Sequence, residues 1–334
     1  MNDEAHSMPA EWQPHAATWL SWPYNADTWS QNLELAQAEF RQLVEAVARF
    51  EPVNLMIGNL DANQLKFDPP NVRLVPIPTN DAWARDYAPT FVKSPSGKLK
   101  SIDWFYNAWG GKYPPFDLDQ NVAQAVAEIL DIENVKVDFC LEGGALEIND
   151  HGTLITTRSC ALAKNRNGDC SQQHVEVLLR KHLGAQNIVW LPGDAIEGDD
   201  TDGHIDQLAR FVDDTTFVHA WTVSDNDPRR PAIARNIDAL KAAMATIDPS
   251  CRFVPLPIPD PIYYCDLTVP ASYCNFLIVN GGVIVPQFDQ PESDANAVAI
   301  LSSCFPDREI VPLPSKNLTV GLGSFHCLSQ QQPK

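Results

Sequence analysis

Short β-type runs in this chain end in nearly the same proline-containing phrase, and the phrase recurs at regular intervals. It reads Val-Pro-x-Pro three times and Val-Trp-Leu-Pro once, with leading valines at positions 75, 189, 254 and 311. The intervals are 114, 65 and 57 residues, and 114 is twice 57, so one copy is missing between the first two. The β-type run Val135-Lys-Val137 lies near the missing place. The spacing therefore predicts five copies of one structural unit.

The segments between these strand ends predict the same order of elements each time. Turn-forming residues separate β-rich runs at 94–97, 149–152, 213–214 and 280–282, as expected for hairpins. Apolar residues recur with helical spacing after three of these hairpins and in an early segment around 28–50. The repeating unit is therefore hairpin, helix, strand. The four apolar stripes are Phe40, Leu43, Val44 and Val47; Val175, Leu178, Leu179 and Leu183; Ile233, Ile237 and Leu240; and Ala297, Ile300, Leu301 and Cys304.

A repeat of this kind favours one closed or stacked array, in which each unit buries its apolar face against its neighbours. The length of 334 residues alone suggests about two domains, at roughly 100–200 residues each. Because the repeat runs through the chain, we expect a single domain over residues 1–334. The last unit lacks a hairpin, and we expect the unpaired β-type run Ala17–Trp22 to close the circle beside the C-terminal segment. A doubly wound α/β sheet is the alternative.

The charge of the chain excludes several classes of partner. It has 24 Lys+Arg and 43 Asp+Glu, a formal net charge of −19, whereas nucleic acids and anionic membrane surfaces are bound by basic patches. Small cationic ligands are favoured instead. No run reaches the ~18 apolar residues that span a bilayer, and the N-terminal stretch 1–6 is acidic where a secretory signal is basic. We therefore expect a cytoplasmic protein that binds neither nucleic acid nor membranes.

The eight cysteines have no spacing typical of zinc ligands, and they are sparse for a disulfide framework. We expect most of them to be small buried hydrophobes.

The residues able to carry chemistry gather in the connectors that follow the strand ends. Equivalent positions of a pseudo-symmetric ring point at one axis, so we expect these connectors to contribute to a single pocket. The candidates are Asp81, Trp83 and Asp86 in the first connector, Glu142 in the second, His204 and Asp206 in the third, and Cys327 in the last.

Each candidate also has an ordinary structural explanation. Asp81 and Asp86 fit a surface turn in which an acid pairs with arginine. Glu142, which precedes two glycines, fits a tight turn, and His204 fits a hydrogen-bonded structural role. Cys327 fits an inert buried cysteine, although the glycines before it permit close approach of a ligand.

Together, however, the candidates supply a nucleophile, an acid/base group, an orienting carboxylate and two further carboxylates. The acidic loop 199–206 does not have the ligand spacing of an EF-hand, so a calcium site is not expected. A guanidinium group is planar and permanently cationic, and its donors match carboxylates bidentately. The combination therefore indicates an enzyme that attacks a guanidinium carbon with a thiolate.

The motifs carrying these residues resemble the agmatine deiminase family, a branch of the guanidine-modifying superfamily. The resemblance covers nearly the whole chain and implies a five-bladed α/β propeller, the pentein fold. The matching motifs, in chain order, are Met8-Pro-Ala-Glu-Trp-Gln-Pro-His15, Trp19-Leu-Ser-Trp-Pro23, Trp83-Ala-Arg-Asp-Tyr-Ala-Pro-Thr-Phe91, Leu141-Glu-Gly-Gly144, Gly203-His-Ile-Asp206 and His326-Cys-Leu-Ser-Gln-Gln331.

The resemblance also implies a role for each matched residue. Cys327 matches the nucleophile, His204 the general acid/base and Glu142 the carboxylate that orients the histidine. Asp86 and Asp206 match the pair that grips the guanidinium nitrogens. Trp83 matches a residue that packs along the alkyl chain of the substrate.

The implied reaction is hydrolytic loss of ammonia through a covalent amidino-thioether, with no cofactor and no metal. Agmatine lacks the carboxylate of arginine, so its far end is a cation; the acidic field favours it, and Asp81 is the candidate for the amine end. The alternatives are a peptidyl-arginine deiminase, a free-arginine deiminase and a polyamine-binding protein of the same fold without turnover. A homodimer is kept open as an assembly state.

Overall fold

The computed structural model describes residues 5–62, 65, 67 and 70–334 of the chain. Residues 1–4, part of the acidic N-terminal stretch, lie outside the described residues. In four blades, two antiparallel strands are followed by a helix and then by a third strand parallel to the second. They contain β4 (Thr90–Lys93), β5 (Leu99–Phe105), α5 (Val122–Leu130) and β6 (Glu133–Cys140); β7 (Glu147–Ile148), β8 (Thr153–Thr157), α8 (Gln172–Leu183) and β9 (Asn187–Leu191); β10 (Ala209–Asp213), β11 (Thr216–Trp221), α9 (Arg230–Ile247) and β12 (Arg252–Pro257); and β15 (Leu277–Val279), β16 (Gly282–Gln287), α10 (Pro291–Cys304) and β17 (Glu309–Pro314).

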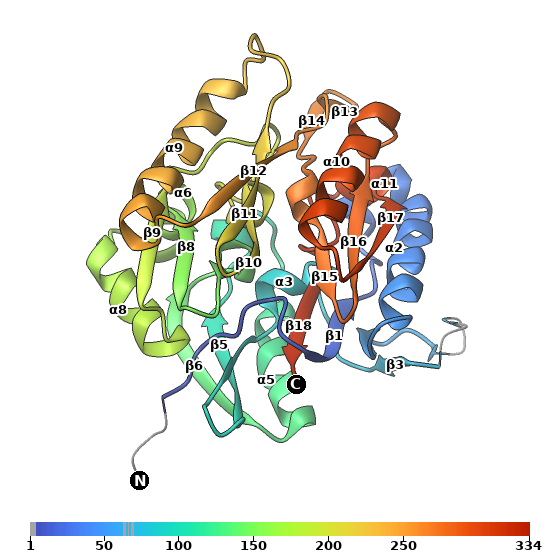
Figure 1. Ribbon diagram of the computed structural model, residues 1–334. Helices are drawn as coiled ribbons and strands as arrows, with labels where there is room; N and C mark the ends of the chain where they lie inside the picture. The colour runs from blue at the N-terminus through green and yellow to red at the C-terminus, as the bar shows by residue number, and fades with distance from the viewer. Residues whose placement is uncertain (1–4, 63–64, 66, 68–69) are drawn as a thin grey trace.

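The fifth blade is built from the two ends of the chain. Strand β1 (His15–Ser21) pairs antiparallel with β18 (Ser329–Pro333) and parallel with β2 (Val53–Met56), and α2 (Leu33–Ala48) connects β1 to β2. This blade repeats the order of the others, with the first strand taken from the C-terminus (Figure 1). The predicted position of the N-terminal run beside the C-terminal segment is therefore confirmed, as are the α/β class and the five repeats.

One strand end was assigned to the wrong position within its unit. The first Val-Pro phrase follows β3 (Val72–Val75), a fourth strand that is added parallel to β2. The third strand of this blade is β2, which ends at Met56 without a proline. The regular interval matched β3 because β3 is the last strand before the connector, as the third strand is in each of the other blades.

The predicted helices form because each buries one apolar stripe against its blade. Phe40, Leu43, Val44 and Val47 of α2 are fully buried, so this stripe meets the core over its whole length. Helix α8 is capped at its start by Ser171, whose side chain accepts a hydrogen bond from the His174 amide. Its C-cap is Gly184, which has the left-handed conformation. Figure 1 shows α8 and α9 on one side of the molecule and α2 on the other, with the strands between them.

The remaining elements are short and mostly lie in the connectors. They are α1 (Ala26–Trp29), η1 (Ser30–Asn32), α3 (Ala84–Tyr87), α4 (Ala108–Gly111), η3 (Asp119–Asn121), η4 (Gly143–Ala145), α6 (Arg158–Ala161), α7 (Lys164–Asn167), η5 (Ile205–Gln207), β13 (Ile262–Tyr264), β14 (Leu267–Val269), η6 (Tyr273–Asn275) and α11 (Lys316–Thr319).

Five of the connectors meet around the centre of the ring. Neighbouring turns contact one another in the order α3, η4, η5, η6, and the turn containing Cys327 completes the circle. The His326 amide donates to the Asn275 carbonyl over 3.2 Å, and the Arg85 amide donates to the Cys327 carbonyl over 3.1 Å. Packing is so close that a Cβ atom on Gly143 would lie 2.2 Å from the Arg85 carbonyl oxygen. The Gly-Gly pair after Glu142 is therefore needed for the turns to converge.

Half of the cysteines, not most of them, are buried: Cys140, Cys160, Cys274 and Cys327, whereas Cys265 is exposed. Among the residues that the structure describes, no helix has both the length and the apolar character needed to cross a bilayer.

Candidate active site

Cys327 lies in the turn before β18 and faces the interior of the ring. Its thiol is 3.5 Å from Oδ2 of Asp206, and it accepts a hydrogen bond from the side-chain amide of Asn275 over 3.1 Å. Burial and the carboxylates of Asp206 and Asp86 raise the pKa of the Cys327 thiol well above its usual value. In the absence of a cationic ligand, the Cys327 thiol is therefore protonated at neutral pH.

Asp86, in α3, is held by two neutral donors. The Gly144 amide donates to Oδ1 over 2.9 Å, and the indole of Trp109 donates to Oδ2 over 3.0 Å. Burial raises the pKa of Asp86 to about 6; the nearby His204 opposes this rise, and the Asp206 and Glu142 carboxylates add to it. Among Asp86, Glu142 and Asp206, Asp86 is thus the carboxylate whose pKa lies closest to neutral pH.

Asp206, in η5, has one oxygen engaged and one without a hydrogen-bond partner. Nδ1 of His326 lies 2.7 Å from Oδ2 of Asp206, whereas the buried Oδ1 is unpaired among the described residues. Burial favours the neutral acid, but the hydrogen bond and charge of His326 outweigh it and lower the pKa of Asp206. An ionised, fully buried carboxylate therefore has one oxygen left to accept a donor.

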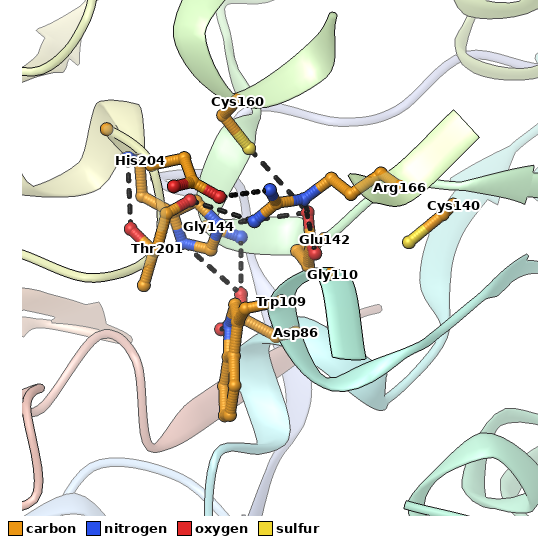
Figure 2. A network of polar contacts seen from close by, with 12 residues as sticks. Asp86, Trp109, Gly110, Cys140, Glu142, Gly144, Cys160, Arg166, Thr201 and His204 are labelled. Carbon is orange, nitrogen blue, oxygen red and sulfur yellow. Dashed lines mark hydrogen bonds and ion pairs between the residues drawn. The ribbon is translucent and has the colours of Figure 1, made fainter. Parts of the chain in front are cut away.

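His204 lies between two of the carboxylates (Figure 2). Its Nδ1 is 3.7 Å from Oδ1 of Asp86, and its Nε2 is 3.8 Å from Oε2 of Glu142. Both distances are too long for hydrogen bonds, and both ring nitrogens are buried without a partner among the described residues. Burial alone lowers the pKa of His204, but Asp86, Cys160 and Glu142 raise it well above its usual value.

Glu142 is fixed by an arginine that the sequence did not single out. Nε of Arg166 donates to both carboxylate oxygens, over 2.8 and 2.9 Å, and both side chains are fully buried (Figure 2). Burial opposes ionisation of Glu142, but the charge of Arg166 and the neighbouring His204 overcome it and lower its pKa to about 2. Glu142 therefore acts on His204 as a permanently charged neighbour rather than as a hydrogen-bond acceptor.

One group among the described residues has the spacing of a metal site. Ligand atoms of Glu142, Cys160 and His204 lie within 4.8 Å of one another, and all three residues are buried. The tertiary structure, not the sequence spacing, brings them together. Because Arg166 already places its positive charge on both oxygens of Glu142, these residues fit a charge-balanced network better than a cation site.

A cavity of about 720 Å³ leads from the surface to Cys327 and Asp86. Trp83 and Asp81 form part of its wall, and Trp83 stacks on Trp29 with ring centroids 5.5 Å apart. Burial raises the pKa of Asp81 to about 6, against hydrogen bonds from Thr28 and the Ala82 amide. The seven sequence candidates thus fall into two groups. Cys327, His204, Glu142, Asp86 and Asp206 gather at the centre, and Trp83 and Asp81 line the approach.

Four site residues were missed by the sequence analysis. Asn275, Trp109, Arg166 and His326 contact Cys327, Asp86, Glu142 and Asp206 respectively. A signal existed for Asn275, because it lies in the connector after the Val254 strand end, the one connector that was not searched. His326 lies beside Cys327 in a quoted motif. For Trp109 and Arg166 no sequence signal was available, because only the fold places them against the acids.

Comparison with known proteins decides the family. A sequence model of the Porphyromonas-type peptidyl-arginine deiminase family matches residues 7–333. The chain belongs to this family. Among the deiminases that it resembles, agmatine deiminase from Ectopseudomonas mendocina is 38% identical over 98% of this chain and 95% of the relative. Agmatine deiminase from Pseudomonas putida is 39% identical with the same coverage.

Solved structures of deiminases give the same assignment. Agmatine deiminase from C. jejuni with substrate bound has a TM-score of 0.92 at 30% identity, covering 100% of this chain and 98% of that one. Agmatine deiminase from Enterococcus faecalis has a TM-score of 0.90 at 31% identity, covering 98% and 96%. SxtG, an amidinotransferase from Microseira wollei, shares the fold alone, with a TM-score of 0.59 at 11% identity, covering 99% and 97%. The predicted resemblance and the pentein fold are confirmed.

Replacing Arg166 by Met should destabilise this deiminase by about 3–5 kcal/mol, because it leaves the buried Glu142 without its counter-charge. Urea unfolding followed by circular dichroism measures the change. The double variant Glu142→Gln/Arg166→Met is the matched control and should recover most of the loss, since neither partner is then an unpaired charge. A single variant as stable as the wild type would contradict the ion pair.

Proposed function

We propose that this chain hydrolyses agmatine to N-carbamoylputrescine and ammonia, with Cys327 as nucleophile. The observation that carries the proposal is the arrangement at the end of the cavity. A buried thiol lies 3.5 Å from an ionised carboxylate that has a free oxygen, with a second carboxylate, Asp86, beside it. A planar cation with several N–H donors satisfies these groups, and its carbon would then face the sulfur.

Binding of the cation prepares the nucleophile. The Cys327 thiol is held protonated by burial and by two carboxylates, and a guanidinium between those carboxylates offsets their charge. The thiol proton is then lost to solvent through the cavity, and the thiolate forms in contact with the carbon that it attacks. The same carboxylates orient that carbon, which lowers the entropic part of the barrier.

His204 handles the protons in the two halves of the reaction. Thiolate attack forms a carbon–sulfur bond, and the protonated His204 gives a proton to one nitrogen, which leaves as ammonia. Water then attacks the amidino-thioether, and His204, now neutral, accepts its proton. Collapse of the adduct breaks the carbon–sulfur bond and releases the remaining hydroxyl proton to solvent through the cavity, which returns the thiolate and a ureido product. Glu142 and Asp86 stabilise the charged imidazole in the first half.

The walls of the cavity favour an amine over a carboxylate at the far end of the substrate. Among the described lining residues the one cationic side chain is Lys112, and it is already paired with Asp202 over 2.9 Å. Asp81 is our candidate partner for the amine, and the Trp83 ring would pack along the alkyl chain. Free arginine and peptidyl-arginine remain the alternative substrates.

The product would enter putrescine and polyamine synthesis. We keep the single domain over residues 1–334, the cytoplasmic location and the homodimer as predictions.

Ammonia release from agmatine, free arginine and an arginine-containing peptide tests the substrate. We expect kcat/KM to be highest for agmatine, because the lining offers no unpaired cation for a carboxylate. Ureido product is measured in parallel. Turnover of the peptide alone would replace agmatine by the alternative, and no turnover with any of the three would favour the binding protein without catalysis.

A cationic alkylating agent tests the nucleophile. We expect chloroacetamidine to alkylate Cys327, with loss of chloride, much faster at neutral pH than neutral iodoacetamide does, because only the cation offsets the carboxylates that keep the thiol protonated. Mass spectrometry of digested protein locates the label. Cys327→Ser should remove both label and turnover while leaving the melting temperature near that of the wild type. Equal rates for the two reagents would argue against this account of the thiol.

The pH profile should report Asp86. Its pKa is raised to about 6, and so is that of Asp81, the candidate partner of the amine end. Both carboxylates are ionised above that pH and neutral below it, so kcat/KM for agmatine should fall as the pH decreases through about 6. Asp86→Asn should lower kcat/KM at every pH and make this acid limb shallower by one proton. An acid limb that is unchanged in Asp86→Asn would assign the titration to another group.

A further inference from the structure

A series of three buried side chains, linked by hydrogen bonds, adjoins Cys327. His326, the residue before Cys327, has Nδ1 2.7 Å from Oδ2 of Asp206 and Nε2 3.0 Å from Oε2 of Glu11. All three side chains are at least nine-tenths buried. Glu11 comes from the N-terminal segment before β1, so it is 315 residues away from His326 in sequence. The mechanism described above uses Asp206 but neither Glu11 nor His326.

The two contacts hold the imidazole from both sides. Both ring nitrogens face carboxylate oxygens at hydrogen-bond distance. Burial opposes ionisation of both carboxylates, yet the pKa of Glu11 is lowered by Arg210 and His326, and that of Asp206 by His326. The geometry therefore places the His326 ring between two ionised carboxylates.

Other groups hold Glu11 in place. Its Oε1 accepts from the Ile278 amide over 2.9 Å, and its Oε2 accepts from Nη2 of Arg210. Arg210 in turn donates to Glu147 over 2.8 Å, and Nε of Arg85 donates to the His326 carbonyl over 3.2 Å.

Each carboxylate of this cluster has a basic neighbour. Glu11 and Glu147 both contact Arg210, and Glu11 and Asp206 both contact His326. Removing one of these contacts would leave a buried carboxylate with fewer partners, which is costly.

We propose that Glu11 and His326 are positioning residues for this deiminase: they hold Asp206 by one oxygen and leave its other oxygen for the guanidinium. The proposal rests on the proposed function, since Asp206 grips the substrate only if the substrate is a cation. The N-terminal segment thereby contributes to the active site without touching the ligand. Residues behind directly contacting groups commonly change affinity or rate on the order of 10–100-fold when altered.

The test compares Glu11→Gln with Glu147→Gln. Both variants remove one negative charge that contacts Arg210 in the same cluster, but only Glu11 contacts His326. In Glu11→Gln, His326 loses the carboxylate that holds its far nitrogen, so its contact with Asp206 weakens and burial then raises the pKa of Asp206. We expect KM for agmatine to rise on the order of 10–100-fold, with a smaller change in kcat. Glu147→Gln should leave KM near the wild-type value.

The acid limb of kcat/KM provides a second readout. In the wild type it should follow Asp86 and Asp81. In Glu11→Gln, Asp206 should titrate with them, so the limb should become steeper than in the wild type. Glu147→Gln should keep the wild-type slope. A merely structural role for Glu11 would lower the melting temperature of its variant without changing either KM or this slope.

Equal KM values and equal slopes in the two variants would overturn the proposal. If Glu11→Gln does not fold, His326→Gln takes its place, because its single side-chain nitrogen replaces two ring nitrogens that face different carboxylates, and the same outcomes apply. Wild-type turnover of agmatine is measured first. Its absence would contradict the proposed function, whereas a normal wild type with two indistinguishable variants would contradict only the positioning role.

Discussion

Three carboxylates, Asp86, Glu142 and Asp206, are buried around one imidazole and one thiol, and the rest of the site depends on how their charge is balanced. Buried charges are stable only when they are paired and hydrogen-bonded. Glu142 has Arg166, and Asp206 has His326. Asp86 receives only the neutral donors Gly144 and Trp109, apart from the more distant His204.

This unequal pairing separates the acidities of the three groups. The paired Glu142 and Asp206 have lowered pKa values, whereas the pKa of Asp86 is raised to about 6. The site therefore has a charge that the protein leaves uncompensated, next to a thiol that the same charge keeps protonated. A guanidinium ligand supplies the missing cation and removes the obstacle to thiolate formation in one step. Selectivity for a cation and activation of sulfur then have the same electrostatic origin.

Much of the fold was accessible from the sequence because its repeat is local. The hairpin turns and the apolar stripes of α2, α8, α9 and α10 are short-range patterns, and each was where the residues indicated. The error at Val75 arose because a strand end has the same local pattern whether it belongs to the third or to the fourth strand of a blade. Strand partners are long-range, so register and sheet order are not contained in one segment.

The sequence by itself determined the repeating unit, the joining of the two chain ends in one blade and the residue types able to attack a guanidinium, because these depend on spacing and on side-chain chemistry. Only the tertiary structure decided which neighbouring residues set the charges of these reactive side chains. Arg166 and Trp109 come from segments with no motif that marks them, and Glu11 lies in a matching motif that gives it no role; each acts through a contact that only the packed blades create. A pKa depends on burial and on charges a few ångströms away, and those distances exist only after the blades have packed.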